Sequence, residues 1–254
     1  MPKNFHLAVD LGTSGCKITV FDFNGLPVAS RTGGYKTYYP GPGSVEQDPG
    51  EWWKVVCQGI SAVIDECSID PKEIAAIGVD GTSWACIPVD KSGQVLRPAM
   101  LWLDRRAQPQ AEWMKGRVGE DRLVETSGNP VDAAYITPKI LWLKDNEPET
   151  YRKTDKFLQS NGYIVYKLTG RYSQDYSQGY GLHFFNIRKG CWDEGIAHEL
   201  GIDLDLMAPL YHSHEVVGTV TVQAAKETGL TPGIPVVAGG LDAACCTLGA
   251  GVIM

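Results

Sequence analysis

Near its beginning the chain carries the sequence AVDLGTSGCKITVFD at residues 8–22. A short apolar arm, residues 5–10, precedes a polar turn, and a second arm has apolar residues at positions 18, 20 and 21. This pattern predicts two strands joined by a tight turn. The turn contains two glycines and two hydroxyl side chains, with an acid before it and a lysine after it.

These turn residues suit the binding of a phosphate group. Glycines allow a sharp turn and let backbone N–H groups approach an anion, and Lys17 adds a positive charge. Asp10 would repel phosphate unless a divalent cation lies between them, and Mg²⁺ binds through one or two carboxylates together with phosphate oxygens. The alternative is an ordinary hairpin with a polar turn. The flanking acid and lysine favour a phosphate site formed by Asp10, Gly12, Thr13, Ser14 and Lys17, with Asp10 as the metal ligand.

Composition excludes several classes of protein. The net charge of −7 over 254 residues argues against non-specific binding of nucleic acid. No apolar run approaches the roughly 20 residues that a membrane span needs, and the first residues run straight into a strand. We therefore expect a cytoplasmic protein without a signal peptide or a membrane partner. The seven cysteines lie mostly in apolar segments without Cys-x-x-Cys spacing, so we expect buried thiols rather than disulfides or zinc.

Helix and strand signals alternate along the rest of the chain. A turn at residues 23–27 and a third strand at 28–32 predict an antiparallel three-strand meander. A helix begins after the N-cap Asp48, and its apolar residues recur every three or four positions, which predicts one buried face. Residues 171–190 are aromatic and polar without a clear period, and we expect them on the surface. Further helices are expected at 108–114, 121–126, 137–145, 161–168, 192–200, 222–228 and 243–248, and further strands at 75–79, 85–89 and 234–239.

Six segments together resemble the FGGY carbohydrate kinases, whose domains have the actin-like ATPase or ribonuclease H-like fold. They occur in the family's order and with similar spacing along the whole chain. The segments are DLGTS (10–14), EQDP before WW (46–53), LWLDRR (101–106), KILWLKDN (139–146), YKLTG (166–170) and GGLDAA (239–244). The resemblance implies an α/β domain with a mixed sheet that opens with the antiparallel three-strand meander and carries helices on both faces.

Members of this family are about twice as long as this chain and have two such domains. The resemblance covers the first domain, so we expect residues 1–254 to be the N-terminal, sugar-binding domain, with the C-terminal nucleotide-binding domain absent. The implied reaction transfers the γ-phosphoryl group of ATP, with Mg²⁺, to a primary hydroxyl of a ketose such as xylulose or a related pentulose. ATP would be held through the missing domain, and the fragment alone would be inactive. A homodimer is left open.

The family's roles are transferred residue by residue. Asp242 matches the acid that accepts the proton of the sugar hydroxyl, although it could instead be only a helix N-cap. Ser83 and Trp84 lie where the family places side chains that recognise the sugar, and Trp84 is equally compatible with the core. Trp102 and Asp104 are at the matching strand end, where Asp104 either accepts from a sugar hydroxyl or pairs with Arg105.

Other functions remain as alternatives. A kinase for glycerol, ribulose or a hexulose would share the same motifs, since the segment at 81–84 matches no single substrate pattern. A non-catalytic actin-like sugar-binding protein would not need an acid at 242. A nuclease of the ribonuclease H type would need several clustered carboxylates for two metals, and the acidic net charge disfavours it.

Overall fold

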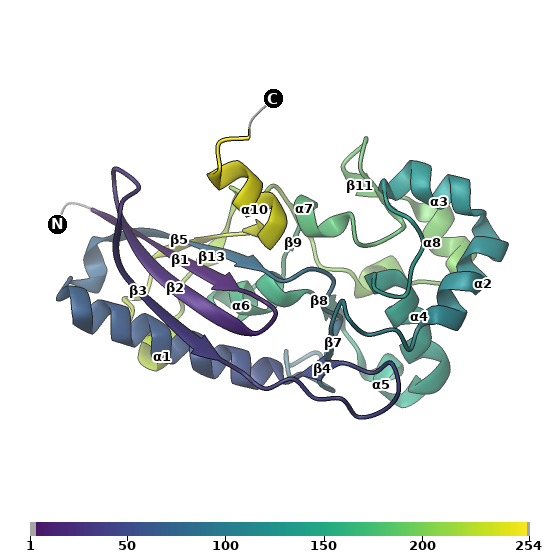
Figure 1. Cartoon of the computed structure of the whole chain (residues 1–254), viewed down its shortest axis with the longest axis horizontal. Coiled ribbons are helices and arrows are strands. Elements are labelled where there is room, and N and C mark those ends of the chain that lie inside the picture. The colour runs from purple at the N-terminus through teal and green to yellow at the C-terminus, as the bar shows by residue number, and fades with distance from the viewer. Residues whose placement is uncertain (1–3, 253–254) are drawn as a thin grey trace.

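A mixed β-sheet forms the centre of the protein in this computed structural model, which describes residues 4–252 (Figure 1). In that range, seven strands make up the sheet. Their order is β13 (Val216–Thr219), β14 (Pro235–Val237), β5 (Ile74–Gly81), β1 (Phe5–Leu11), β2 (Gly15–Asp22) and β3 (Pro27–Gly34), and β15 (Gly240–Leu241) also pairs with β5. Strand β5 is parallel to β1, β14 and β15, whereas β1, β2 and β3 are antiparallel. The expected three-strand meander is therefore confirmed.

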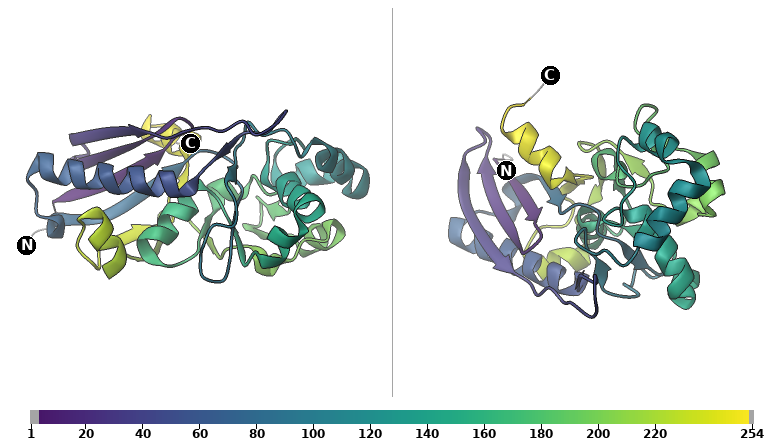
Figure 2. Two further views of the ribbon diagram at one scale, coloured as in Figure 1. Left: turned by 90° about the horizontal axis from the view of Figure 1, so that it is seen from below. Right: turned by 45° about the vertical axis from the view of Figure 1, so that its right-hand side comes forward.

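Helices cover one face of this sheet. Three of them pack together there, namely α1 (Pro49–Cys67), α6 (Ser160–Thr169) and α9 (Val222–Thr228). Helix α1 begins as predicted, with Oδ1 of Asp48 accepting the N–H of Gly50 at 2.8 Å. Its buried side chains form one hydrophobic cluster with Leu7, Val9 and Leu11 of β1. Because side chains alternate along a strand, Asp10 lies on the opposite face, where α10 (Asp242–Gly249) is found in Figures 1 and 2.

A second hydrophobic cluster lies beside the sheet, in the right-hand part of Figure 1. It is enclosed mainly by helices α2 (Gln108–Val118), α3 (Glu120–Ser127), α4 (Ile136–Asn146) and α8 (Glu194–Leu200). The remaining elements are short: α5 (Pro148–Lys153), α7 (Tyr176–Gly179), the 3-10 helices η1 (Pro71–Glu73) and η2 (Leu204–Leu206), and the strand pairs β4 (Glu46–Gln47) with β7 (Ala99–Met100), β6 (Ile87–Val89) with β8 (Lys156–Leu158), β9 (Gln174–Asp175) with β12 (Leu210–Tyr211), and β10 (Phe185–Asn186) with β11 (Cys191–Trp192).

Most of the segment 171–190 is not on the surface: residues 173–185 are largely buried, so the expectation is wrong for them, whereas Arg171 and residues 187–189 are exposed as expected. Asp175, Gln178, His183 and Phe184 are at most 1% exposed. The segment lacks a period because it folds into short turns and one-turn elements, and many of its buried polar groups have hydrogen-bond partners. For example, Nε2 of Gln178 donates to the carbonyl oxygen of Gly81 at 2.9 Å.

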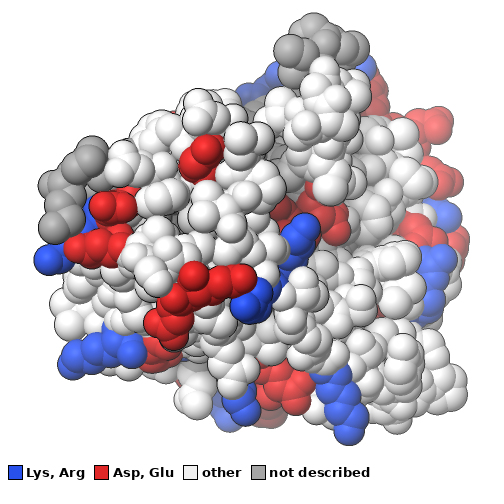
Figure 3. Space-filling view, turned by 60° about the vertical axis from the view of Figure 1, so that its left-hand side comes forward, with Lys and Arg blue, Asp and Glu red and all other residues white. Residues whose placement is uncertain are grey.

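The cysteines follow the expectation only in part. Cys16 and Cys86 are fully buried, whereas Cys191 and Cys246 are exposed. Over residues 4–252, none of the helices is long and apolar enough to cross a bilayer. On the face shown in Figure 3, acidic and basic side chains are interspersed.

Candidate active site

Three parallel strands end side by side at the candidate site. In the register of β1 and β5, Asp10 is opposite Asp80, and in that of β5 and β15, Gly240 is opposite Asp80. The chain continues from β15 directly into Asp242, the first residue of α10. Parallel pairing therefore brings Asp10 and Asp242, which are predicted site residues, to the same sheet edge, together with Asp80, which sequence reasoning did not select.

Asp80 is the carboxyl group that holds a proton in this cluster. Its pKa is raised to about 8, first by burial and then by the negative charge of Asp10, by a side-chain hydrogen bond with Asp10 and by the charge of Asp242. Neighbouring carboxylates disfavour ionisation of one another, so a proton shared between Asp10 and Asp80 relieves the repulsion. One sequence signal could have revealed Asp80: Val79-Asp80-Gly81-Thr82-Ser83 echoes Val9-Asp10-Leu11-Gly12-Thr13-Ser14, and the register superposes the two aspartates.

The loop at residues 12–15 is held by side chains from four other segments. Oγ1 of Thr13 is 3.1 Å from Oγ1 of Thr82, and it also accepts from Nε1 of Trp102 at 3.1 Å. The carbonyl oxygen of Thr13 accepts from Nε2 of Gln47 at 2.8 Å, and that of Gly12 accepts from the hydroxyl of Tyr35. The loop is therefore fixed in place before any anion arrives.

The other two predicted loop residues face solvent. Ser14 is exposed, and so is Lys17. Lys17 is directly opposite Asp10 in the β1–β2 register, and directly opposed side chains of an antiparallel pair lie on the same face of the sheet. The position of Lys17 is thus compatible with contact to a phosphate held above Asp10, and its role stays a prediction.

Asp242 begins helix α10, and its surroundings distinguish it from an N-cap. The capping position is Leu241, which has no side-chain hydrogen bond to the helix. Asp242 is half-buried, and its Oδ1 accepts the backbone N–H of Ala243 at 2.7 Å. Its carboxylate therefore lies at the N-terminal end of α10 and bonds the first backbone N–H after it.

A buried hydrogen-bond relay fixes the strand end just before Asp242. The backbone N–H of Leu241 donates to Oγ of Ser177 at 2.9 Å, and Ser177 in turn donates to Oδ1 of Asp175 at 2.6 Å. Asp175 is 1% exposed, and Nδ2 of Asn161 donates to its other oxygen at 2.8 Å. Sequence reasoning missed Asp175 and Ser177 because both lie in the segment that was expected on the surface.

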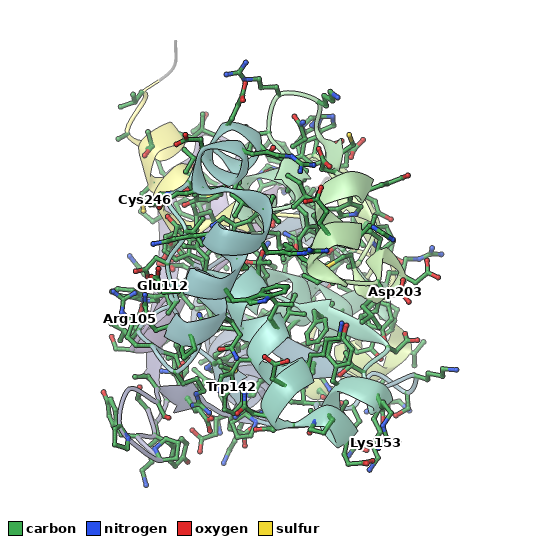
Figure 4. All side chains as sticks on the ribbon, turned by 90° about the vertical axis from the view of Figure 1, so that its right-hand side faces the viewer. Arg105, Glu112, Trp142, Lys153, Asp203 and Cys246 are labelled. Carbon is green, nitrogen blue, oxygen red and sulfur yellow. The ribbon has the colours of Figure 1, made fainter. Side chains whose placement is uncertain are left out.

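A pocket of about 590 Å³ lies next to the loop, at the junction of the sheet and the second hydrophobic cluster. Two of the predicted substrate residues, Trp84 and Trp102, line it, and Trp102 also bonds the loop through Thr13. The remaining lining residues are Leu103, Arg105, Lys115, Glu120, Pro130, Val131, Asp132, Ala134 and Tyr135. Arg105, labelled in Figure 4, forms an ion pair with Asp132. Ser83 is half-buried and not among the lining residues, so its role stays a prediction.

Trp84 is both packed and at the pocket, so the two interpretations of this residue are not exclusive. Its ring centroid lies 4.2 Å from that of Tyr135 and 5.9 Å from that of Tyr180. Its φ is +54°, a conformation that bulky residues rarely adopt. Burial and the charge of Asp242 raise the pKa of Tyr180, and the neighbouring Trp84 indole acts in the opposite direction. Within residues 4–252, Nε1 of Trp84 is buried without a hydrogen bond of normal geometry.

Asp104 is placed differently from the expectation. It is 0% exposed, and its carboxylate accepts from Nη2 of Arg106 at 2.7 Å and from the N–H of Val45 at 2.7 Å. The expected alternative partner, Arg105, pairs with Asp132 instead. The geometry favours a structural role for Asp104, since its oxygens are already occupied by protein donors, and its predicted contact with substrate is not supported by exposure.

Comparison with known proteins places this geometry in a family. The model of the "FGGY family of carbohydrate kinases, N-terminal domain" matches residues 5–249. The chain is 33% identical to the xylulose kinase of Bacillus subtilis over 247 residues, which is 97% of this chain and 49% of that protein. It is 35% identical to a xylulose kinase of Staphylococcus epidermidis over 253 residues, or 100% of this chain and 50% of that one.

A solved structure shows the same architecture. The xylulose kinase of Rhodospirillum rubrum superposes with a TM-score of 0.93 at 25% identity, over 98% of this chain and 51% of that one. The chain thus spans about half the length of these relatives. By its fold and by the family model that covers nearly all of it, the chain belongs to the FGGY family of carbohydrate kinases and corresponds to their N-terminal domain.

Proposed function

We propose that this chain is the sugar-binding half of an ATP-dependent kinase that phosphorylates a primary hydroxyl of a ketose, with xylulose or a related pentulose as the acceptor. One observation carries the proposal: Asp10, the loop at 12–15 and Asp242 meet at the ends of adjacent strands, beside a pocket lined by Trp84 and Trp102. The similarity to xylulose kinases supports the choice of sugar.

The chemistry assigned to these residues is proton acceptance and positioning. Asp242, half-buried at the start of α10, would accept the proton of the attacking hydroxyl. The loop at 12–15 would hold the transferred phosphoryl group through backbone N–H groups and the Thr13 hydroxyl. In a loose transition state, positioning and electrostatic stabilisation provide most of the catalysis.

The donor set near the loop fits a magnesium ion. Mg²⁺ is held by one or two carboxylates together with phosphate oxygens and water. Asp10 provides one carboxylate, and Asp80 lies hydrogen-bonded beside it. Within residues 4–252, the candidate site included, no group of three or more His, Cys, Asp or Glu side chains is arranged to hold a metal, so phosphate oxygens and water would supply the other ligands. When bound with ATP, the ion would neutralise charge on the phosphoryl group.

The nucleotide would be held by a second domain, because the chain matches only about half of its relatives. Helix α10 offers a surface for it. Its residues Ala243, Ala244 and Cys246 are exposed, and so is Leu248 at 65%. An apolar helix face of this kind is typical of an interface.

The test uses ligand binding first and catalysis second. Xylulose, ribulose, glycerol and gluconate are each added to the purified chain, and the melting temperature is followed. We expect a pentulose to stabilise the chain by mass action and glycerol to have little effect. Stabilisation by none of the four would contradict the sugar site.

Catalysis is then measured as ADP release with ATP and the bound sugar. We expect none from the 254-residue chain, and turnover when the chain is fused to the C-terminal half of the B. subtilis xylulose kinase. Robust sugar-dependent ADP release by the chain alone would refute the need for a second domain. Sugar binding by an inactive fusion would favour a non-catalytic binding protein.

A further inference from the structure

Lys139 is fully buried at the end of the first turn of helix α4. Its Nζ donates to three backbone carbonyl oxygens, those of Trp84 at 2.9 Å, Leu101 at 2.6 Å and Ala134 at 2.6 Å. An ammonium group has three N–H donors, so each of them has one carbonyl partner. The sequence motif that contains Lys139 indicated the family but gave this residue no role.

The three carbonyls belong to three separate segments of the pocket wall. Trp84 lines the pocket itself, Leu101 precedes the lining residue Trp102, and Ala134 lines the pocket next to Tyr135. The ammonium group of Lys139 therefore connects three segments of the pocket wall through their backbone carbonyls, from the side away from the pocket. None of the three carbonyl residues lies within a strand or helix. The Trp84 and Leu101 segments are also joined by the backbone bridge between Cys86 and Met100, whereas Lys139 adds the link to Ala134.

The charge of Lys139 matters to this arrangement. Burial lowers its pKa to about 7, whereas the negative charges of Asp104 and Asp132 act in the opposite direction and Arg106 adds to the effect of burial. The three carbonyl dipoles point their negative ends at Nζ and likewise favour the ammonium form. A neutral amine has two hydrogens and would leave one buried carbonyl without a donor.

Of the three segments, the one at Trp84 depends most on its bond to Lys139. Its left-handed backbone conformation, at φ +54°, persists only where surrounding contacts hold it. The bond from Lys139 to the Trp84 carbonyl is such a contact, and the ring is held between Tyr135 and Tyr180. Within residues 4–252 the indole N–H is buried and makes no hydrogen bond of normal geometry, so backbone and ring contacts fix the position of Trp84.

We propose that Lys139 is a positioning residue that sets the shape of the sugar pocket by joining the Trp84, Leu101 and Ala134 carbonyls. The inference rests on the proposed sugar-binding function. Lys139 would not touch the sugar; it would act through the position of Trp84 and Trp102. Misplacement of a contact group by about 1 Å is enough for effects of up to about 100-fold.

The experiment compares Lys139→Met with Lys144→Met in the same helix. Lys144 is exposed and donates to the carbonyl oxygen of Gly201, so its replacement also removes a lysine–carbonyl bond, but away from the pocket. Xylulose affinity is measured by calorimetry on the folded fraction. The environment of Trp84 is measured as the part of the near-ultraviolet circular dichroism that is lost in Trp84→Phe, because the chain has seven tryptophans. We expect Lys139→Met to weaken xylulose binding by about 10- to 100-fold and to alter the tryptophan signal, and Lys144→Met to change neither.

The outcomes separate this inference from the proposed function. If the wild-type chain binds no pentulose, the proposed function fails, while an altered tryptophan signal in Lys139→Met still supports the positioning role. Xylulose binding of equal strength in wild type and Lys139→Met would overturn the inference alone. If Lys139→Met does not fold, NMR of the wild-type chain tests the inference instead. The Lys139 ammonium protons should exchange slowly with water, and they should exchange more slowly in the presence of saturating xylulose. Exchange that does not respond to xylulose would overturn the inference.

Discussion

Replacing Asp80 by Asn should change the pH dependence of stability in a defined direction. The pKa of Asp80 is raised from 3.8 to about 8 in the folded protein, chiefly by burial and by the charge of Asp10. The folded state therefore binds this proton more tightly than the unfolded chain does. The contribution of Asp80 to the free energy of unfolding is fully present below about pH 4, and it is lost as the pH rises toward 8.

The size of the effect follows from the shift. A pKa difference of one unit between the folded and unfolded states corresponds to about 1.4 kcal/mol. The free energy of unfolding can therefore change by at most about 4 kcal/mol between about pH 5 and pH 8 through this group. Because Asp80 is only partly buried and solvent screens its charge, we expect about 2 kcal/mol. Asn has nearly the same shape and no ionisation, so Asp80→Asn should remove this term.

The assay is urea denaturation of the wild type, Asp80→Asn and Asp65→Asn in metal-free buffer at several pH values from about 5 to 8. Asp65 is an exposed residue of α1 and serves as the control. We expect Asp80→Asn to match the wild type near pH 5 and to exceed its free energy of unfolding by about 2 kcal/mol near pH 8. A difference that stays constant across this range, or one of opposite sign, would refute the reasoning about the carboxyl cluster.

Three further substitutions test the rest of the site. Asp242→Asn in the catalytically competent fusion should lower turnover by about 10²–10⁴-fold with little change in sugar affinity, and near-normal turnover would exclude Asp242 as the base. Ser177→Ala should lower the free energy of unfolding by about 1–3 kcal/mol, because Asp175 and the N–H of Leu241 each lose a partner; urea denaturation with no loss would contradict the relay. Trp84→His should change which sugar stabilises the chain, and it should also lower the melting temperature by a few degrees because the ring packs on Tyr135. An unchanged sugar preference would remove Trp84 from recognition.

The parts of the fold that were predictable from the sequence depend on local patterns. The meander β1–β2–β3 follows from short alternating arms and tight turns, and α1 follows from the Asp48 cap and one apolar face. Each of these signals is contained in a few neighbouring residues, so it can be recognised without knowledge of contacts between distant parts of the chain. The resemblance to the family then gave the overall order of elements, which local patterns alone could not supply.

The segment 171–190 shows where such patterns fail. Its residues are polar because they form a buried hydrogen-bond network, and burial of polar groups leaves no hydrophobic period to detect. Oδ2 of Asp175 accepts from Asn161, which lies 14 positions earlier, and Nε2 of Gln178 reaches back to the carbonyl oxygen of Gly81. A sequence shows that such groups exist but not that partners distant in the chain will satisfy them.

The cluster of Asp10, Asp80 and Asp242 shows the same dependence on partners distant in the chain at the candidate site. Asp10 and Asp242 could be proposed individually, because each follows an apolar strand and precedes a characteristic turn or helix. Asp80 also follows an apolar strand and precedes a polar turn, but its proximity to the other two acids follows from the pairing of β5 with β1 on one side and with β15 on the other. Pairing in parallel register places Asp80 between the predicted metal ligand and the predicted base, where a shared proton lowers the repulsion among three acids. Under the proposed function, a cation at Asp10 would compete with that proton for the carboxylate oxygens, so the three aspartates together, rather than any one of them, would set the charge of the site.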